Sequence, residues 1–109
     1  MTTGTIVLIP FPFSELTNIK VRPAIVVSNT KDKYQDLILC AISSVVPIKL
    51  GQFEIALLPN SVNQLRVPSI IKVDRIATLK KENIITSLGK ISKDQKKLFI
   101  NLFKQLIDK

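Results

Sequence analysis

Arginine, serine, lysine and aspartate residues stand at the ends of several apolar runs, where they could bind a phosphate group and act on it. Arg22 is followed by Pro23, which restricts the arginine backbone to extended geometry, and the planar guanidinium is suited to phosphate. From the residues alone, a surface arginine that closes a loop by donating to backbone carbonyls explains the pattern better.

Two further motifs could supply polar groups to such a site. The segment AISS ends an apolar run, and Ser43 or Ser44 could donate to a phosphoryl oxygen, although an ordinary strand-to-turn serine is the simpler explanation. In KVDR, strand alternation predicts Lys72 and Asp74 on one face and Arg75 on the other. A cross-strand ion pair would explain Asp74 near Lys72 just as well as a catalytic role would.

The segment PFPFSELTNIK (10–20) is predicted to be an ordered loop. Pro10 and Pro12 lack the amide proton that a central strand needs for its hydrogen bonds. Phe11 and Phe13 could stack on unpaired bases, although we expect at least one of them to pack into the core.

The sequence indicates neither a cofactor nor a metal ion. It has no histidine, no glycine-rich phosphate loop and no residues spaced as metal ligands. Its one cysteine, Cys40, lies in the apolar segment LILCAI and is predicted to be buried and inert. Any chemistry must therefore use Arg, Lys, Ser, Thr, Asp, Glu or Tyr side chains.

Chain length and charge limit the classes of protein. The 109 residues predict a single domain, 1–109. The formal net charge of +8 favours a polyanion or an acidic protein as partner, although solubility alone explains it about equally well. No run approaches the ~18 apolar residues of a membrane span and no leader is evident, so we expect a cytoplasmic protein without membrane contact.

Short apolar and β-branched runs must position these side chains, and they predict a mainly β domain. The runs cover residues 5–9, 24–28, 37–43, 53–58 and 69–73. Segment 59–68 is bounded by prolines and is predicted to form a short helical turn. Strands that are apolar on both faces need cover on both faces, which one helix cannot provide, so we expect a second copy of the chain as a partner.

Only the tail has a helical period. Ser92 and Gln95 have the spacing of a capping box, which predicts the start of an amphipathic helix of about four turns. The apolar face of this helix is formed by Leu98, Phe99, Leu102, Phe103 and Leu106.

The segment GTIVLIPFPFSELTNIKVRPAIVVSN (4–29) resembles the N-terminal signature of the PemK/MazF toxins of bacterial type II toxin-antitoxin systems. That signature is a glycine-led strand, a Phe-Pro loop, and Arg-Pro at the head of an apolar strand. PSIIKVDRIATLKKENI (68–84) and LGKIS (88–92) resemble the second block of the family, and the C-terminal helix is also similar. The resemblance covers nearly the whole chain and is weakest over residues 44–66.

The resemblance implies a small SH3-like barrel with a C-terminal α-helix that acts as a homodimer. It also implies a metal-independent, sequence-selective endoribonuclease of single-stranded RNA that needs no cofactor. In that reaction the ribose 2′-hydroxyl attacks the adjacent phosphate and leaves 2′,3′-cyclic phosphate and 5′-hydroxyl ends. A cognate antitoxin is the implied partner, with an acidic or apolar segment that covers the RNA groove.

The family motifs fall on named residues of this chain. Arg22 matches the catalytic arginine, and Ser43 stands in the place of the threonine that commonly partners it. Lys72 and Asp74 occupy the positions of an Arg-x-Asp pair, so the implied catalytic set is Arg22, Ser43 and Asp74. We assign RNA binding to Phe13, Lys20, Ser44, Lys72 and Arg75.

Two other functions stay open. The departures at Ser43 and Lys72 could mark a catalytically inactive nucleic-acid or protein binding module of the same fold. A CcdB-like inhibitor of DNA gyrase shares the barrel, but such toxins use a C-terminal tryptophan and this chain contains no tryptophan. We rank the ribonuclease first, the inactive module second and the gyrase inhibitor third.

Overall fold

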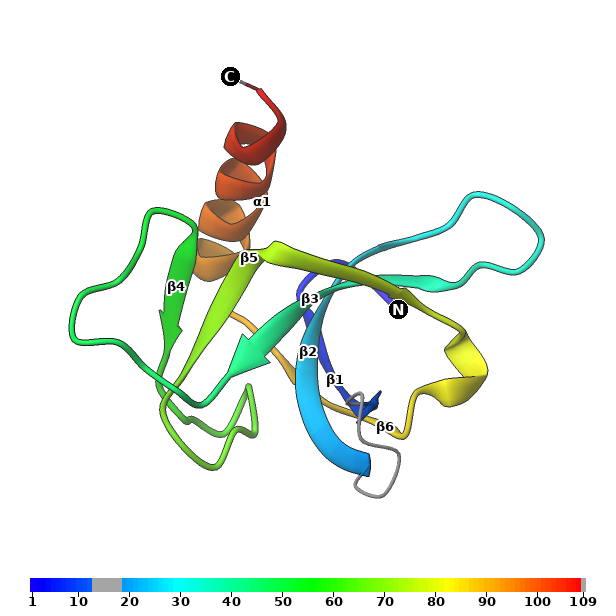
Figure 1. Ribbon diagram of the computed structural model, residues 1–109, viewed down its shortest axis with the longest axis horizontal. Coiled ribbons are helices and arrows are strands. Elements are labelled where there is room, and N and C mark those ends of the chain that lie inside the picture. Colours follow the sequence, from blue (N-terminus) through cyan, green and yellow to red (C-terminus); the bar gives the residue numbers. More distant parts are fainter. Residues whose placement is uncertain (13–18, 109) are drawn as a thin grey trace.

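Within residues 1–12 and 19–108, which the computed structural model describes, six antiparallel strands form one sheet in the order β4-β5-β3-β2-β1-β6. The strands are β1 (Thr5–Pro12), β2 (Ile19–Asn29), β3 (Leu37–Ser43), β4 (Glu54–Leu57), β5 (Ser69–Leu79) and β6 (Thr86–Lys90). A 3-10 turn, η1 (Lys81–Asn83), precedes β6, and the helix α1 (Lys93–Ile107) follows it. Figure 1 shows a curled half-barrel with α1 at one end, which confirms the predicted mainly β fold with a C-terminal helix.

Strands β1 and β2 extend into the segment that was predicted to be a loop. Pro10 pairs with Val21 and Pro12 with Ile19, so the prediction was wrong for these positions. The physical reason is that β6 pairs with β1 only as far as Leu8. Beyond Leu8, β1 is an edge strand, where a proline nitrogen that faces away from β2 costs no ladder bond. The sequence also failed to predict β6, because TSLGK has no apolar alternation.

A bulge bends β5 in its middle. Lys72 lies opposite Ala41 of β3 while Ile76 lies opposite the preceding residue, Cys40, so residues 73–75 have no partners on β3. The Val73 amide donates instead to the carbonyl of Phe53, at 2.9 Å, and the Val73 carbonyl accepts from Cys40 Sγ, at 3.3 Å. Because Val73 is fully buried, the bulge is held from inside the core.

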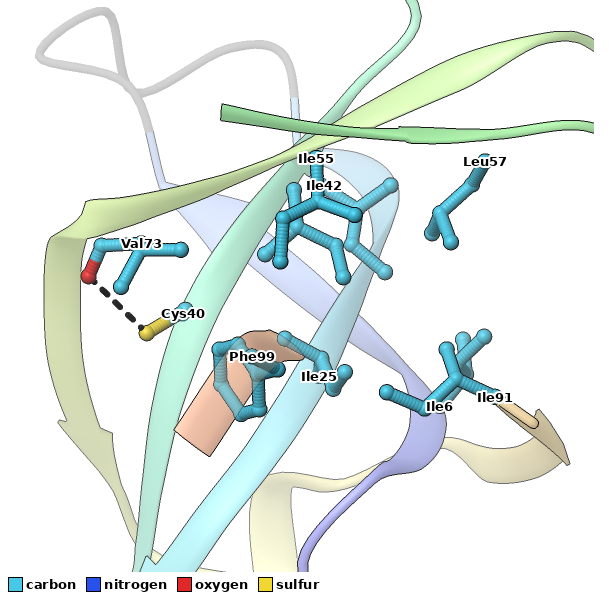
Figure 2. Close-up of a cluster of buried hydrophobic side chains, with 10 residues drawn as sticks. Ile6, Ile25, Cys40, Ile42, Ile55, Leu57, Val73, Ile91 and Phe99 are labelled. Atoms are coloured by element: carbon cyan, nitrogen blue, oxygen red, sulfur yellow. Dashed lines mark hydrogen bonds between the residues drawn. The ribbon is translucent and has the colours of Figure 1, made fainter. Parts of the chain in front are cut away.

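Apolar side chains cover both faces of the curled sheet. On one face, Phe99 of α1 packs with Ile25 and Cys40, and Figure 2 shows these side chains with the bond from Cys40 to Val73. The opposite face carries a smaller cluster of Val7, Ile9, Ala24, Val26, Leu37 and Leu39. Strands that are buried on both faces explain why the apolar runs in the sequence are nearly continuous.

The helix begins as predicted. Ser92 Oγ accepts from the Gln95 amide, at 3.2 Å, and Gln95 Oε1 accepts from the Ser92 amide, at 3.1 Å, which confirms the capping box. Phe99 is buried and its ring contacts Phe103 edge-on, but Leu98 is 46% exposed, so the predicted apolar face was wrong at that position. In the described part of the chain, no helix is both long and apolar enough to cross a membrane.

The connection from β4 to β5 (58–68) contains the single helical turn that was predicted, because the Gln64 amide donates to the Asn60 carbonyl, four residues earlier, at 3.0 Å. Asn63, only 1% exposed, holds it together: its Oδ1 accepts from the amides of Asn60 and Leu65, and its Nδ2 donates to the Leu58 carbonyl. The connection is also fastened to β6, because the Lys90 amide donates to the Val62 carbonyl at 3.1 Å. Side-chain bonds of this kind supplement the backbone bond of the turn.

Gly89 lets β6 approach this connection closely, so Gly89→Ala should destabilise the protein. A Cβ at position 89 would clash with the Val62 carbonyl oxygen and lie 2.9 Å from the Asn63 carbonyl oxygen, both of them backbone atoms. We expect a loss of about 2 kcal/mol or more in urea unfolding. In the control, Gly51→Ala, the nearest atom is the end of the Glu54 side chain, which can move. Equal losses for the two variants would contradict the close approach.

Cys40 should resist alkylation in the folded protein. Burial, with a smaller effect of the Asp74 carboxylate, raises the pKa of the Cys40 thiol to about 12 from the ordinary 9.0. At pH 8 the thiolate fraction is then about 1,000-fold lower than in the unfolded chain, and iodoacetamide should react more slowly by a similar factor. The folded state also keeps this proton to higher pH, so the thiol's contribution to stability is present below pH 9.0 and is lost as the pH rises toward 12. Alkylation measured by mass spectrometry with and without urea tests this, and similar rates would overturn it.

Candidate functional site

A pocket of about 550 Å³, here called pocket A, lies beside the smaller apolar cluster of the sheet, with which it shares Ile9, Ala24 and Leu39. Its apolar lining comes from four strands and includes Ile9, Ala24, Leu39 and Ile76. Five of the residues singled out in the sequence also line it: Arg22, Ser43, Lys72, Asp74 and Arg75. The tertiary fold therefore brings together side chains that are up to 53 positions apart in the chain.

The strand register explains why these side chains share a face. Directly opposed residues of antiparallel strands point to the same side of a sheet, as do residues two apart in one strand. Arg22 lies opposite Ile9, and Ala24 lies opposite Ala41, which in turn lies opposite Lys72. Arg22, Ala24, Ala41 and Lys72 therefore share one face of the sheet across three strands, β2, β3 and β5.

Arg22 lies where β2 separates from β3. The ladder between these strands includes Ala24 and Ala41 but no pair beyond them, and Pro23 has no amide proton with which to extend it. Continuing the same register by two residues would set Arg22 opposite Ser43. Both side chains are half-buried, which limits the water around them and strengthens their interaction with an anion.

The two serines of AISS have separate environments. Ser43 Oγ accepts from the Val45 amide, at 3.1 Å, so it also acts as the strand-to-turn serine that was the simpler prediction. Its hydroxyl proton can still be donated to a ligand in pocket A. Ser44 does not line pocket A and lines a different pocket, described below.

The bulge in β5 brings Lys72, Asp74 and Arg75 to the same pocket. Simple alternation predicted Arg75 on the face opposite to Lys72 and Asp74, and this prediction was wrong. Cys40 and Ala41 are adjacent in β3, but their partners in β5 are separated by the three bulged residues 73–75, which interrupts the alternation. Among the described residues that line pocket A, three cations and one carboxylate give a net charge of +2. This combination can bind a phosphate and offers one carboxylate as a proton acceptor.

The sequence analysis also assigned RNA binding to Lys20 and Phe13. Lys20 is exposed on β2, two residues from Arg22 on the same face, but it does not line pocket A. Phe13 falls outside the described residues. Among residues 1–12 and 19–108, no group of three or more His, Cys, Asp or Glu side chains could hold a metal ion.

Another pocket, of about 420 Å³ and here called pocket B, borders pocket A at Arg22, Pro23 and Ile42, which line both. It is lined by Arg22 and Ser44 together with Gln64 and Arg66 from the β4–β5 connection. Arg66 was missed by the sequence analysis. A single cation between two prolines carries no local signal, because its neighbourhood depends on how the connection docks on the sheet.

The chain was compared with known proteins. A family model described as "PemK-like, MazF-like toxin of type II toxin-antitoxin system" matches residues 2–106. Among solved structures, an endoribonuclease from a mycobacterial species, in complex with its cognate antitoxin, is similar with a TM-score of 0.69. The two chains are 16% identical, and the match covers 96% of this chain and 92% of the other. No curated protein matches significantly.

These comparisons agree with the geometry of the chain. The structural likeness, at this low identity, concerns the fold, and it matches the barrel and C-terminal helix that the sequence resemblance implied. The family match spans every strand and nearly all of α1. The chain therefore belongs to the PemK-like, MazF-like toxins of type II toxin-antitoxin systems.

Proposed function

We propose that this toxin cuts single-stranded RNA without a metal ion, and that pocket A is the site of cleavage. The observation that carries the proposal is the convergence of Arg22, Ser43, Lys72, Asp74 and Arg75 on one pocket. Membership of the toxin family and the fold shared with an endoribonuclease support it. The net charge of +8 favours a polyanionic substrate, because each neutralised phosphate releases counterions.

The proposed reaction uses a nucleophile that belongs to the substrate. The ribose 2′-oxygen attacks the adjacent phosphorus, and the bond from phosphorus to the 5′-oxygen breaks. The 2′-hydroxyl gives its proton to a base, and the departing 5′-oxygen takes up a proton from solvent. The ends are a 2′,3′-cyclic phosphate and a 5′-hydroxyl, so the protein needs neither a covalent nucleophile nor a metal-bound hydroxide.

Each side chain then has a defined task. The guanidinium of Arg22 binds two phosphate oxygens and stabilises the charge that develops on them. Lys72 and Arg75 add positive charge, and the Ser43 hydroxyl donates to a phosphoryl oxygen. Asp74 accepts the proton of the 2′-hydroxyl. The apolar lining of pocket A can pack against a ribose or an unstacked base, which favours a single strand over a duplex.

We also propose two protein partners and a cellular location. The mycobacterial structural neighbour is in complex with its cognate antitoxin, which supports an antitoxin for this chain too. An acidic segment of such a partner would complement the cations of pocket A. A second copy of the chain would cover exposed apolar side chains such as Val45, Ile48 and Ile107. Cleavage of messenger RNA would take place in the cytoplasm.

Purified protein mixed with a long RNA in EDTA should produce 5′-hydroxyl ends at a restricted set of sequences. Arg22→Ala should slow cleavage by about 10²–10³-fold, because it removes the main stabilising charge, and Arg22→Lys should recover only part of the rate. Sequencing of the 5′-hydroxyl ends over time measures both effects.

The matched control is Lys93→Ala, which removes a cation from the exposed start of α1 and should cut at the wild-type rate. Unchanged cleavage by Arg22→Ala would remove pocket A from the mechanism. Absence of 5′-hydroxyl ends from the wild-type protein would favour the inactive binding module instead.

The protein should be a dimer in solution. Light scattering at micromolar concentration should report twice the chain mass of 12.2 kDa. Aspartate at either of two exposed apolar positions, Ile48→Asp or Ile107→Asp, should shift the mass to the monomer if that position lies in the interface. A wild-type monomer across this range would contradict the proposed homodimer.

A further inference from the structure

We propose that pocket B holds a nucleotide next to the scissile phosphate, that Gln64 selects its base, and that Arg66 binds a further phosphate. The inference rests on the proposed ribonuclease function and deepens it. It concerns how the toxin selects an RNA sequence. None of the described residues that line pocket A is an asparagine or a glutamine, so that pocket offers no side-chain amide to read a base.

The two pockets are adjacent and share Arg22, Pro23 and Ile42 in their linings. Leu8 and Pro23 form an opposed pair on the face away from Ile9 and Arg22, and both line pocket B. Ser43 lines pocket A and Ser44 lines pocket B, as expected of successive residues that leave a strand. A phosphate bound by Arg22 would therefore have one flanking nucleotide directed to each pocket.

The lining of pocket B suits a nucleobase with its phosphate. Leu8, Leu65 and Leu88 supply apolar surface that can pack against the flat faces of a base. Arg22 and Arg66 supply two guanidinium groups for phosphates. This mixture of apolar walls and a few polar groups is typical of small-molecule sites.

Gln64 is held in place before any ligand binds. Its backbone adopts a left-handed conformation, φ 59°, which is costly for a residue other than glycine. Its amide donates to the Asn60 carbonyl at 3.0 Å, and buried Asn63 ties the neighbouring backbone on both sides. Figure 1 shows this connection, between β4 and β5, close to the end of β3.

The carboxamide of Gln64 indicates which bases would be selected. Its Nε2 donates to the carbonyl of Ser61, which fixes the orientation of the amide. Oε1 can then accept a hydrogen bond from an exocyclic amine. Pocket B should therefore prefer a base that offers an exocyclic amine to Oε1 (adenine, cytosine or guanine) over uracil, whose one base donor is the ring N3–H.

The test compares cleavage profiles of Gln64→Gly and the wild-type protein. Glycine suits a positive φ, so this variant keeps the connection folded while it removes the base-reading side chain. Wild-type 5′-hydroxyl ends should show at least about fivefold selection against uracil at one position beside the cut, and Gln64→Gly should reduce it below about twofold. The matched control is Gln35→Gly, another glutamine at positive φ (50°) that lines neither pocket, and its profile should equal wild type.

Arg66→Ala should act differently, because a phosphate contact carries no sequence information. It should slow cleavage at all sites alike and reduce the slope of log rate against log salt by about 0.7. Lys97→Ala, which removes an exposed cation of α1, is the control for net charge. An unchanged base profile for Gln64→Gly, with normal cleavage, would overturn the inference and leave the proposed function intact.

A second readout separates the two hypotheses if the wild-type protein does not cut RNA. A random single-stranded library with 2′-fluoro in place of every 2′-hydroxyl cannot be cut by the proposed route but can still be bound and sequenced. Loss of the base preference in Gln64→Gly would then uphold pocket B although the ribonuclease proposal had failed. Identical bound sequences for wild type and variant would reject pocket B as well.

Discussion

The β5 bulge at residues 73–75 is the feature on which pocket A depends. Val73 is drawn into the core, where its amide and carbonyl are bonded to Phe53 and to the Cys40 thiol outside the regular ladder. The neighbouring Asp74 and Arg75 are therefore exposed and join Lys72 at the pocket. A regular strand would have placed Arg75 on the opposite face, because alternation has a period of two. The apolar core thus determines the arrangement of charge at the surface.

Arg22 is the second element of the arrangement, because it borders both pockets. Pairing between β2 and β3 ends at Ala24 and Ala41. Beyond this pair the two strands separate and leave Arg22 and Ser43 at the opening. A planar, permanently charged fork on a paired strand is well suited to orient a phosphate, because its backbone is already ordered. The proposed mechanism and the proposed base selection both require this residue to contact the scissile phosphate.

Several features could be read from the sequence because they depend on neighbours in the chain. Apolar runs predicted five of the six strands within the described residues, and the Ser92–Gln95 spacing predicted the start of α1. The errors have a common cause, which is that distant contacts overrode local rules. Pro10 and Pro12 are tolerated in β1 because β6 stops at Leu8, and the bulge in β5 brings Arg75 to the pocket of Lys72 although alternation predicted the other face.

The class of fold and the burial of Cys40 follow from the amino-acid sequence, and the family resemblance supplied the residue types of the candidate site. Which of these residues meet depends on the tertiary structure. Pairing of β2 with β3 and of β3 with β5 joins the distant segments that carry Arg22, Ser43 and Lys72, and the docked connection adds Gln64 and Arg66 beside them. The physical reason is that side-chain direction follows from local alternation, whereas register, bulges and loop docking follow from packing between segments that have no local signal for one another.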